Sequence, residues 1–332
     1  MQNSQVDPIN FRAQDWIDGC RAPVISKKKK SSVGTPFLVL ANVVCSLGTV
    51  FSNKLLFTEQ SYSFPLTITF FNFAFNTLLL YVSVSCKAFE LKSVPRRQFA
   101  GLAVLFALSV VLMNMSAAEN SVGFYQLMKI IHTPMIAFIE TILHGYRRTI
   151  PEVAALSLIC FGIGQATVHD VTATFRGATI ALIGALVTSW YQTQVGVRSK
   201  ELNVSGPELS YYTYPLSTII LIPVIPMIEG VGGFLQLSMK RSLLGMLGVS
   251  CVASFGLNVT FASITGRTSA LLFQVIGHFK TCLVLLIGWR YFDSPMSARQ
   301  LVGVGIGFTG LIFYSLVKPA STPLKLGRKK TS

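Results

Sequence analysis

The sequence predicts an all-α polytopic membrane protein in which ten transmembrane helices form two inverted five-helix repeats. Three observations predict this class. Only 12% of the 332 residues are charged and 51% are hydrophobic, whereas a soluble domain carries about 25% charged residues. Ten apolar segments are each long enough to cross a bilayer. Finally, a motif of the fourth segment recurs in the ninth at a constant offset, which relates the two halves of the chain.

Each apolar segment is predicted to be a helix, because backbone groups in lipid must form their hydrogen bonds within the segment. The connections are short, so no soluble domain is present to house chemistry. The predicted membrane domain is residues 34–318, preceded by a tail of residues 1–33 and followed by a tail of residues 319–332, with repeats over about 34–168 and 176–318. In order, the segments are residues 34–57, 64–86, 99–118, 122–144, 151–168, 176–198, 208–229, 242–263, 268–290 and 298–318.

The distribution of lysine and arginine predicts that both chain ends are cytosolic. With a cytosolic N-terminus, 20 of the 28 basic residues fall in cytosolic loops and tails, about five fall on the opposite side, and three lie within the membrane. The net charge of +15 is therefore read as a topology signal and an attraction to anionic lipid, and not as nucleic-acid binding. The basic tail of residues 1–33 lacks the apolar core of a secretory signal, and its acidic residues argue against a transit peptide.

The two halves share a weak internal repeat. NSVGFYQLMKIIHT (120–133) aligns with TSALLFQVIGHFKT (268–281) at an offset of 148, which places Gln126 on Gln274 and Thr133 on Thr281. Since each half contains an odd number of helices, the second half must be inverted in the membrane. Inverted repeats place a substrate site near the midplane, between the halves.

Two lysines in the middle of apolar segments, Lys129 and Lys280, predict a binding site for an anionic solute. A lysine at this depth costs a few kcal/mol or more unless it faces a partner or a water-filled cavity. Neither has an acid within one helical turn, and an ammonium group suits phosphate. The alternatives are snorkelling, or pairing with Glu119 or Glu140. For Lys54, near the end of the first segment, a solute or gating role is weighed against snorkelling to the membrane surface.

Several tyrosines and glutamines are candidates for orienting the uncharged part of the solute. Buried side chains of these types must find hydrogen bonds, either from a ligand or from neighbouring helices. Near the membrane surface, tyrosines can instead anchor a helix at the interface. The candidates are Tyr125 and Gln126 one turn before Lys129, Gln274 at the equivalent of Gln126, Tyr211 and Tyr212 at the start of the seventh segment, and Tyr191 and Gln192 within the sixth.

Other chemistry is not indicated. The six cysteines show no metal-binding spacing and no disulfide framework. The sequence contains no nucleophile–base arrangement and no phosphate-binding loop, so we predict neither an enzyme nor an ATP-driven pump, with no cofactor and no metal. Glu140 is expected at a solvated helix end. Glycines of the last segment (Gly303, Gly305, Gly307, Gly310) predict close packing and suggest a homodimer face.

The chain resembles the nucleotide-sugar transporters of the drug/metabolite transporter superfamily over roughly residues 35–318. The stretches that carry this resemblance are NKLLF (53–57), NSVGFYQLMK (120–129), VTSWYQTQVGVRSKELNVS (187–205), ELSYYTYPLS (208–217) and GHFKTCLVLLIGW (277–289). They look most like the branch shared by solute carrier family 35 member E proteins, plant UDP-rhamnose/UDP-galactose transporters and plastid triose-phosphate translocators. The resemblance implies ten helices in two inverted repeats, alternating access, and exchange of a nucleotide sugar for a nucleoside monophosphate.

The resemblance also implies roles for individual residues. Lysines of the fourth and ninth helices contact phosphate in this family, and they correspond to Lys129 and Lys280. The pair Lys280-Thr281 resembles a Lys-Thr subgroup, whereas plastid phosphate translocators have Lys-Arg at this point. The FYNN motif of GDP-mannose transporters is replaced here by Tyr211-Tyr212-Thr213-Tyr214. We therefore expect a UDP-sugar, galactose-like, in exchange for UMP.

The carboxyl end, Lys329-Lys330-Thr331-Ser332, resembles a coat-protein retrieval signal and suggests the endoplasmic reticulum or Golgi apparatus. Two alternatives remain open for the function. One is an organic-phosphate translocator for triose phosphate or phosphoenolpyruvate, which would share the fold and the lysines. The other is a membrane scaffold of the same fold that transports nothing.

Overall fold

The computed structural model describes residues 34–58, 64–95, 97–145, 148–168, 173–230, 232, 241–291 and 297–317, and these contain ten helices and no strand. Both tails, including Lys329 and Lys330, lie outside the described residues. The helices are α2 (Thr35–Thr58), α3 (Pro65–Ser85), α4 (Arg97–Glu119), α5 (Val122–His144), α6 (Ile150–Thr167), α7 (Phe175–Glu201), α8 (Gly206–Ile228), α10 (Arg241–Arg267), α11 (Ala270–Tyr291) and α12 (Ala298–Leu316).

Each of the ten predicted segments coincides with a helix to within a few residues, which confirms the helical prediction. Local sequence explains several boundaries. The Thr174 hydroxyl accepts a hydrogen bond of 3.0 Å from the Gly177 amide at the start of α7. Ser297 and Gln300 form a reciprocal capping box at the start of α12. Helix α5 ends where Gly145 takes a positive φ of 63°, a conformation that glycine adopts without steric cost.

Within the described residues, seven helices are long and apolar enough to cross a membrane, and the chain is an integral membrane protein. They are α2, α3, α4, α6, α8, α10 and α12. Their outward faces carry large apolar side chains such as Phe37 and Phe161, which are 64% and 57% exposed and suit a lipid environment. The other three helices are α5, α7 and α11; α5 carries Lys129 and α11 carries Lys280.

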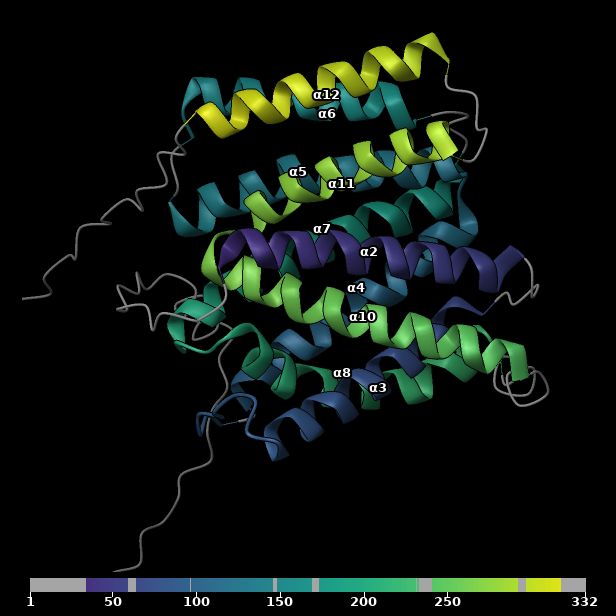
Figure 1. The fold of residues 1–332 in the computed structure, drawn as a ribbon, viewed down its shortest axis with the longest axis vertical. Helices are drawn as coiled ribbons and strands as arrows, with labels where there is room; N and C mark the ends of the chain where they lie inside the picture. The colour runs from purple at the N-terminus through teal and green to yellow at the C-terminus, as the bar shows by residue number, and fades with distance from the viewer. Residues whose placement is uncertain are drawn as a thin grey trace, which may run out of the picture.

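Figure 1 shows the helices stacked along the long axis of the molecule, with α6 and α12 at one end and α3 and α8 at the other. Helices α6 and α12 pack very closely through glycines. A Cβ atom at Gly303 would lie 2.6 Å from the Ala166 nitrogen, and one at Gly310 would lie 2.8 Å from the Ile159 nitrogen. The expectation that the glycines of this helix form a dimer face is therefore wrong for Gly303, Gly307 and Gly310, which contact α6 of the same chain.

An aromatic cluster joins α3, α4, α7 and α8 on one side of the molecular centre. Phe106 stacks on Phe73 with ring centroids 4.6 Å apart and on Tyr191 at 4.8 Å, while Tyr214 meets Phe106 edge-on at 5.2 Å. Phe73, Phe106, Tyr191 and Tyr214 are all buried. Because aromatic rings supply large contact areas, this cluster fixes the inner faces of these four helices, two of which, α4 and α7, also line the site described next.

Candidate functional site

A cavity of about 360 Å³ opens between the helices, a volume at the lower end of the range for ligand pockets. Six helices contribute to its wall, namely α2, α4, α5, α7, α10 and α11. The wall residues are Ser46, Phe106, Ser109, Val110, Met113, Asn114, Tyr125, Thr188, Tyr191, Gln192, Leu257, Asn258, Phe261, Phe273 and Lys280. The cavity therefore includes residues from both halves of the chain.

Lys280 is the charged residue among those that line the cavity. Its Nζ donates a hydrogen bond of 2.8 Å to Oδ1 of Asn42, on α2, and lies 5.2 Å from the centroid of the Phe273 ring. Both partners are neutral. The ammonium charge is therefore solvated by an amide dipole and a ring face and is not cancelled by an acid in these contacts, which suits an anionic ligand.

Lys129 lies on α5 with its Nζ 4.4 Å from the centroid of the Tyr125 ring, and Tyr125 lines the cavity. The Lys129 side chain is exposed, and its charge is close enough to Lys280 to repel it. The acids considered as structural partners for Lys129 pair elsewhere. Glu119 meets Arg176 at 3.6 Å and Glu140 pairs with Arg148. The two lysines thus add positive potential to the same region.

The other side chains of the wall are neutral, and they are either aromatic or aliphatic side chains or polar side chains that can form hydrogen bonds. Phe106, Phe261 and Phe273 supply apolar surface. Two polar atoms of α7, Oγ1 of Thr188 and Oε1 of Gln192, are buried without a hydrogen-bond partner in the part of the chain that the structure describes. Unsatisfied buried groups are costly, so a ligand that bonds to them would gain affinity.

The sequence does not predict several of the wall residues. For Gln192, it leaves a hydrogen bond to a ligand and a hydrogen bond to a neighbouring helix as equal alternatives. Asn114, Thr188 and Asn258 were not predicted, although a polar side chain inside an apolar segment is itself a signal that it needs a partner. Asn42 was also missed. It is fully buried and is the residue that holds Lys280.

Thr281, Gln126 and Gln274 were also predicted for the site, and they are not among the residues that line the cavity. Thr281 is half-buried and donates a 3.2 Å hydrogen bond to the Gly277 carbonyl of its own helix. Gln126 and Gln274 are half-buried. Lys54 lies in α2, but its side chain is outside the described residues.

Tyr211 and Tyr212 contribute to helix packing near the start of α8. The Tyr212 hydroxyl donates a 2.6 Å hydrogen bond to the Lys92 carbonyl, and its ring stacks on Phe99 at 4.7 Å. The Tyr211 ring meets Tyr81 edge-on at 4.9 Å. These contacts are made with neighbouring parts of the protein, and neither ring is among the residues that line the cavity.

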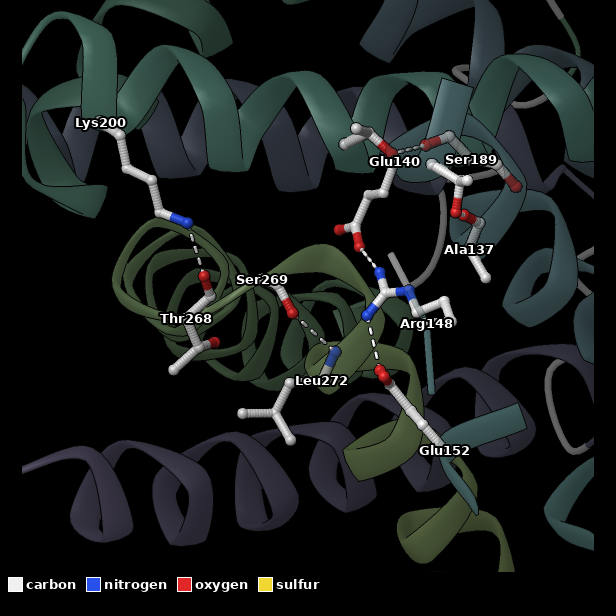
Figure 2. A network of polar contacts seen from close by, with 11 residues as sticks. Ala137, Glu140, Arg148, Glu152, Ser189, Lys200, Thr268, Ser269 and Leu272 are labelled. Carbon is white, nitrogen blue, oxygen red and sulfur yellow. Dashed lines mark hydrogen bonds and ion pairs between the residues drawn. The ribbon is translucent and has the colours of Figure 1, made fainter. Parts of the chain in front are cut away.

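A buried ionic cluster ties the end of α5 to the start of α6 (Figure 2). The Arg148 guanidinium bonds to Glu140 and also to Glu152, the latter at 2.6 Å. Glu140 is only 5% exposed, so the expectation that it lies at a solvated helix end is wrong. At the same end of the bundle, Lys200 of α7 donates a 2.7 Å hydrogen bond to the Thr268 carbonyl, directly before α11. These contacts hold α5, α6, α7 and the start of α11 together.

Known proteins support a transport role for this architecture. Residues 36–315 match the model of the Triose-phosphate Transporter family. A UDP-rhamnose/UDP-galactose transporter 1 of Arabidopsis thaliana is 32% identical over 293 residues, which cover 87% of this chain and 84% of the relative. A UDP-xylose transporter 3 of the same plant is 28% identical over 92% of this chain and 87% of its own length.

The fold also matches a solved crystal structure. The two structures match with a TM-score of 0.67 and 13% sequence identity, and the match covers 85% of this chain and 96% of the other. At this identity the match concerns the fold alone. Together with the family match over residues 36–315 and the identity to the transporters above, the conclusion is that this chain belongs to the Triose-phosphate Transporter family, whose members are transporters and not enzymes.

Proposed function

We propose that the protein exchanges a UDP-sugar, galactose-like, for UMP across an intracellular membrane. The single observation that carries this proposal is the cavity itself, where Lys280 faces a neutral wall of rings, amides and hydroxyls. A nucleotide sugar has the matching chemistry, since its phosphates are anionic and its base and sugar are neutral, flat or rich in hydrogen-bonding groups. The names of the plant relatives, UDP-rhamnose/UDP-galactose and UDP-xylose transporters, support the same class of substrate.

In this proposal Lys280 and Lys129 bind the phosphates. Gln192, Thr188 and the neighbouring asparagines of the wall bond to the base or sugar, and the phenylalanine rings cover its faces. Thr281 and Gln126 support the two lysines from the same helices. When the site is empty, the two lysines have no anion beside them within the membrane. This disfavours the change between the two access states without a bound substrate, and it therefore favours exchange.

Alternating access would follow from two inverted five-helix repeats, with all ten helices crossing the membrane. The offset of 148 residues pairs α2 with α7, α3 with α8, α4 with α10, α5 with α11 and α6 with α12. The helices of each pair lie at similar levels in Figure 1. Packing also follows this pairing, because α2 packs on α10 as α7 packs on α4, and α3 packs on α10 as α8 packs on α4.

The positions of the basic residues support cytosolic termini, and the dilysine end supports retention in the endoplasmic reticulum or Golgi apparatus by coat proteins. With this orientation, the ionic cluster of Figure 2 lies at the cytosolic end. The cluster would then close the cytosolic side of the cavity.

Uptake by purified protein in liposomes tests the substrate class. Liposomes preloaded with UMP are offered labelled UDP-galactose, and UDP-xylose, GDP-mannose, CMP-sialic acid, phosphoenolpyruvate and triose phosphate are added as competitors. The proposal expects the UDP-sugars to compete best. Uptake of the phosphoesters without uptake of UDP-sugars would select the organic-phosphate translocator. No uptake of any compound by folded protein would favour the non-transporting scaffold.

A further inference from the structure

Asn42 links three helices beside Lys280, which lines the cavity. Its Nδ2 donates to the Leu257 carbonyl at 3.2 Å and to the Thr260 hydroxyl at 2.8 Å, both on α10. Its Oδ1 accepts the 2.8 Å hydrogen bond from Lys280 on α11. Asn42 itself lies on α2 and is fully buried, and therefore its amide cannot exchange these partners for water.

The chemistry of the partners determines which way the Asn42 amide points. A carbonyl can only accept a hydrogen bond, so Leu257 requires the NH₂ group. The Thr260 hydroxyl donates its own proton to the carbonyls of Gly256 and Leu257, at 2.6 Å and 3.0 Å, so its oxygen is free to accept from Asn42. With both N–H groups directed at α10, only Oδ1 is left for the ammonium of Lys280.

This contact has two consequences for Lys280. It fixes the position of Nζ at the cavity while using one of the three N–H donors of the ammonium, so that two remain for a ligand. It also stabilises the charge with a dipole and does not neutralise it. A carboxylate in the same place would form an ion pair and remove the attraction for an incoming anion.

We propose that Asn42 is a positioning residue for anion binding, which aims Lys280 into the cavity and keeps its charge available to the phosphate of the substrate. The inference rests on the proposed function only for the identity of that substrate, because any anion that binds at Lys280 would depend on the same contact.

Asn53 provides a matched control. It lies on the same helix, and its Oδ1 accepts a 2.9 Å hydrogen bond from Ser250 on α10. Asn53 and Asn42 thus each link α2 to α10 through an amide, but only the bond of Asn42 is with Lys280. A substitution that acts by weakening the α2–α10 contact should act at both positions.

The test compares Asn42→Asp, Asn42→Ala, Asn53→Asp and Asn53→Ala in liposomes. Inhibition of UDP-galactose uptake is measured with UMP, inorganic phosphate and neutral uridine as competitors. We expect Asn42→Asp to raise the inhibition constants of UMP and phosphate at least about tenfold, since it places a carboxylate within bonding distance of Lys280, and to leave that of uridine within about twofold. Asn42→Ala should raise the constants of the anions less, and the Asn53 variants should leave them within about twofold.

Two results would overturn the proposal. One is wild-type inhibition by UMP and phosphate in Asn42→Asp, or in Asn42→Ala if the aspartate variant does not fold. The other is an equal loss of anion binding in the Asn53 variants, or an equal loss for uridine. If the wild type does not take up UDP-galactose, the proposed function fails separately. The Asn42 inference is then tested by the shift in melting temperature that inorganic phosphate causes in the wild type and in each variant.

Discussion

Lys280→Met separates the role of the ammonium in substrate binding from its role in folding. The methionine keeps an unbranched apolar chain of similar length but removes the charge and the hydrogen bond to Asn42. Lys280 is the charged group on the cavity wall, so the substitution should affect an anionic ligand directly.

The expected magnitude follows from the contacts that are lost. A hydrogen bond to a charged group contributes about 1.5–3 kcal/mol. Since 1.4 kcal/mol corresponds to a factor of ten, the affinity for UMP should fall by about 10- to 150-fold. Stability should change little, because the variant also removes the cost of burying an ammonium whose contacts are neutral.

The measurement combines UMP inhibition of UDP-galactose uptake with melting of the purified protein, with and without UMP. Arg176→Gln is the control, since this cation is 73% exposed and its ion pair with Glu119 lies at the surface. We expect the stabilisation by UMP to disappear in Lys280→Met while the melting temperature without UMP is retained, and the control to match the wild type. Unchanged UMP affinity in a folded Lys280→Met protein would refute the reasoning.

Three further predictions concern packing, the ionic cluster and topology. Gly162→Ala should lower the stability by about 1–3 kcal/mol, because its Cβ would collide with the backbone of α12. Gly305→Ala should leave the stability unchanged, because no atom lies within 4 Å of the added Cβ. Equal melting temperatures of the two variants would contradict the close packing of α6 on α12. Arg148→Met should destabilise the protein by about 3–5 kcal/mol, since it leaves two buried carboxylates unpaired; an unchanged melting temperature would contradict this. The topology is tested with a membrane-impermeant maleimide in sealed vesicles whose cytosolic face is outward. The reagent should label a variant with Cys86 as its only cysteine, whereas a variant whose only cysteine is Ala298→Cys should react only after permeabilisation. The opposite result would contradict cytosolic termini.

The sequence predicts the helices, and it singles out Lys280 as a candidate, because the relevant signals are local. Apolar runs of about 20 residues define helices in a membrane protein without knowledge of their neighbours. A lysine without a nearby acid in such a run is unusual in itself. The structure places Lys280 on a cavity wall, as expected of a residue that binds a solute. Asn42 was missed because its contact with Lys280 spans 238 residues, and neither residue's surroundings in the sequence indicate the other.

The sequence does not predict which neighbours each helix packs against. In a membrane helix that is apolar on all sides, periodicity does not reveal which face meets protein and which meets lipid. The glycines of α12 were therefore expected at a dimer face, although they pack on α6. Glu140 was expected in solvent because it lies near a helix end, but Arg148 returns from the following loop to bury it.

Uptake of labelled UDP-galactose into liposomes that contain either UMP or buffer alone tests directly whether the protein exchanges a UDP-sugar for UMP. We expect rapid uptake into the UMP-loaded liposomes and much slower uptake into those with buffer alone, and we expect Lys280→Met to reduce the exchange strongly. Equal rates in loaded and empty liposomes would contradict exchange, and full activity of Lys280→Met would contradict the assignment of the cavity.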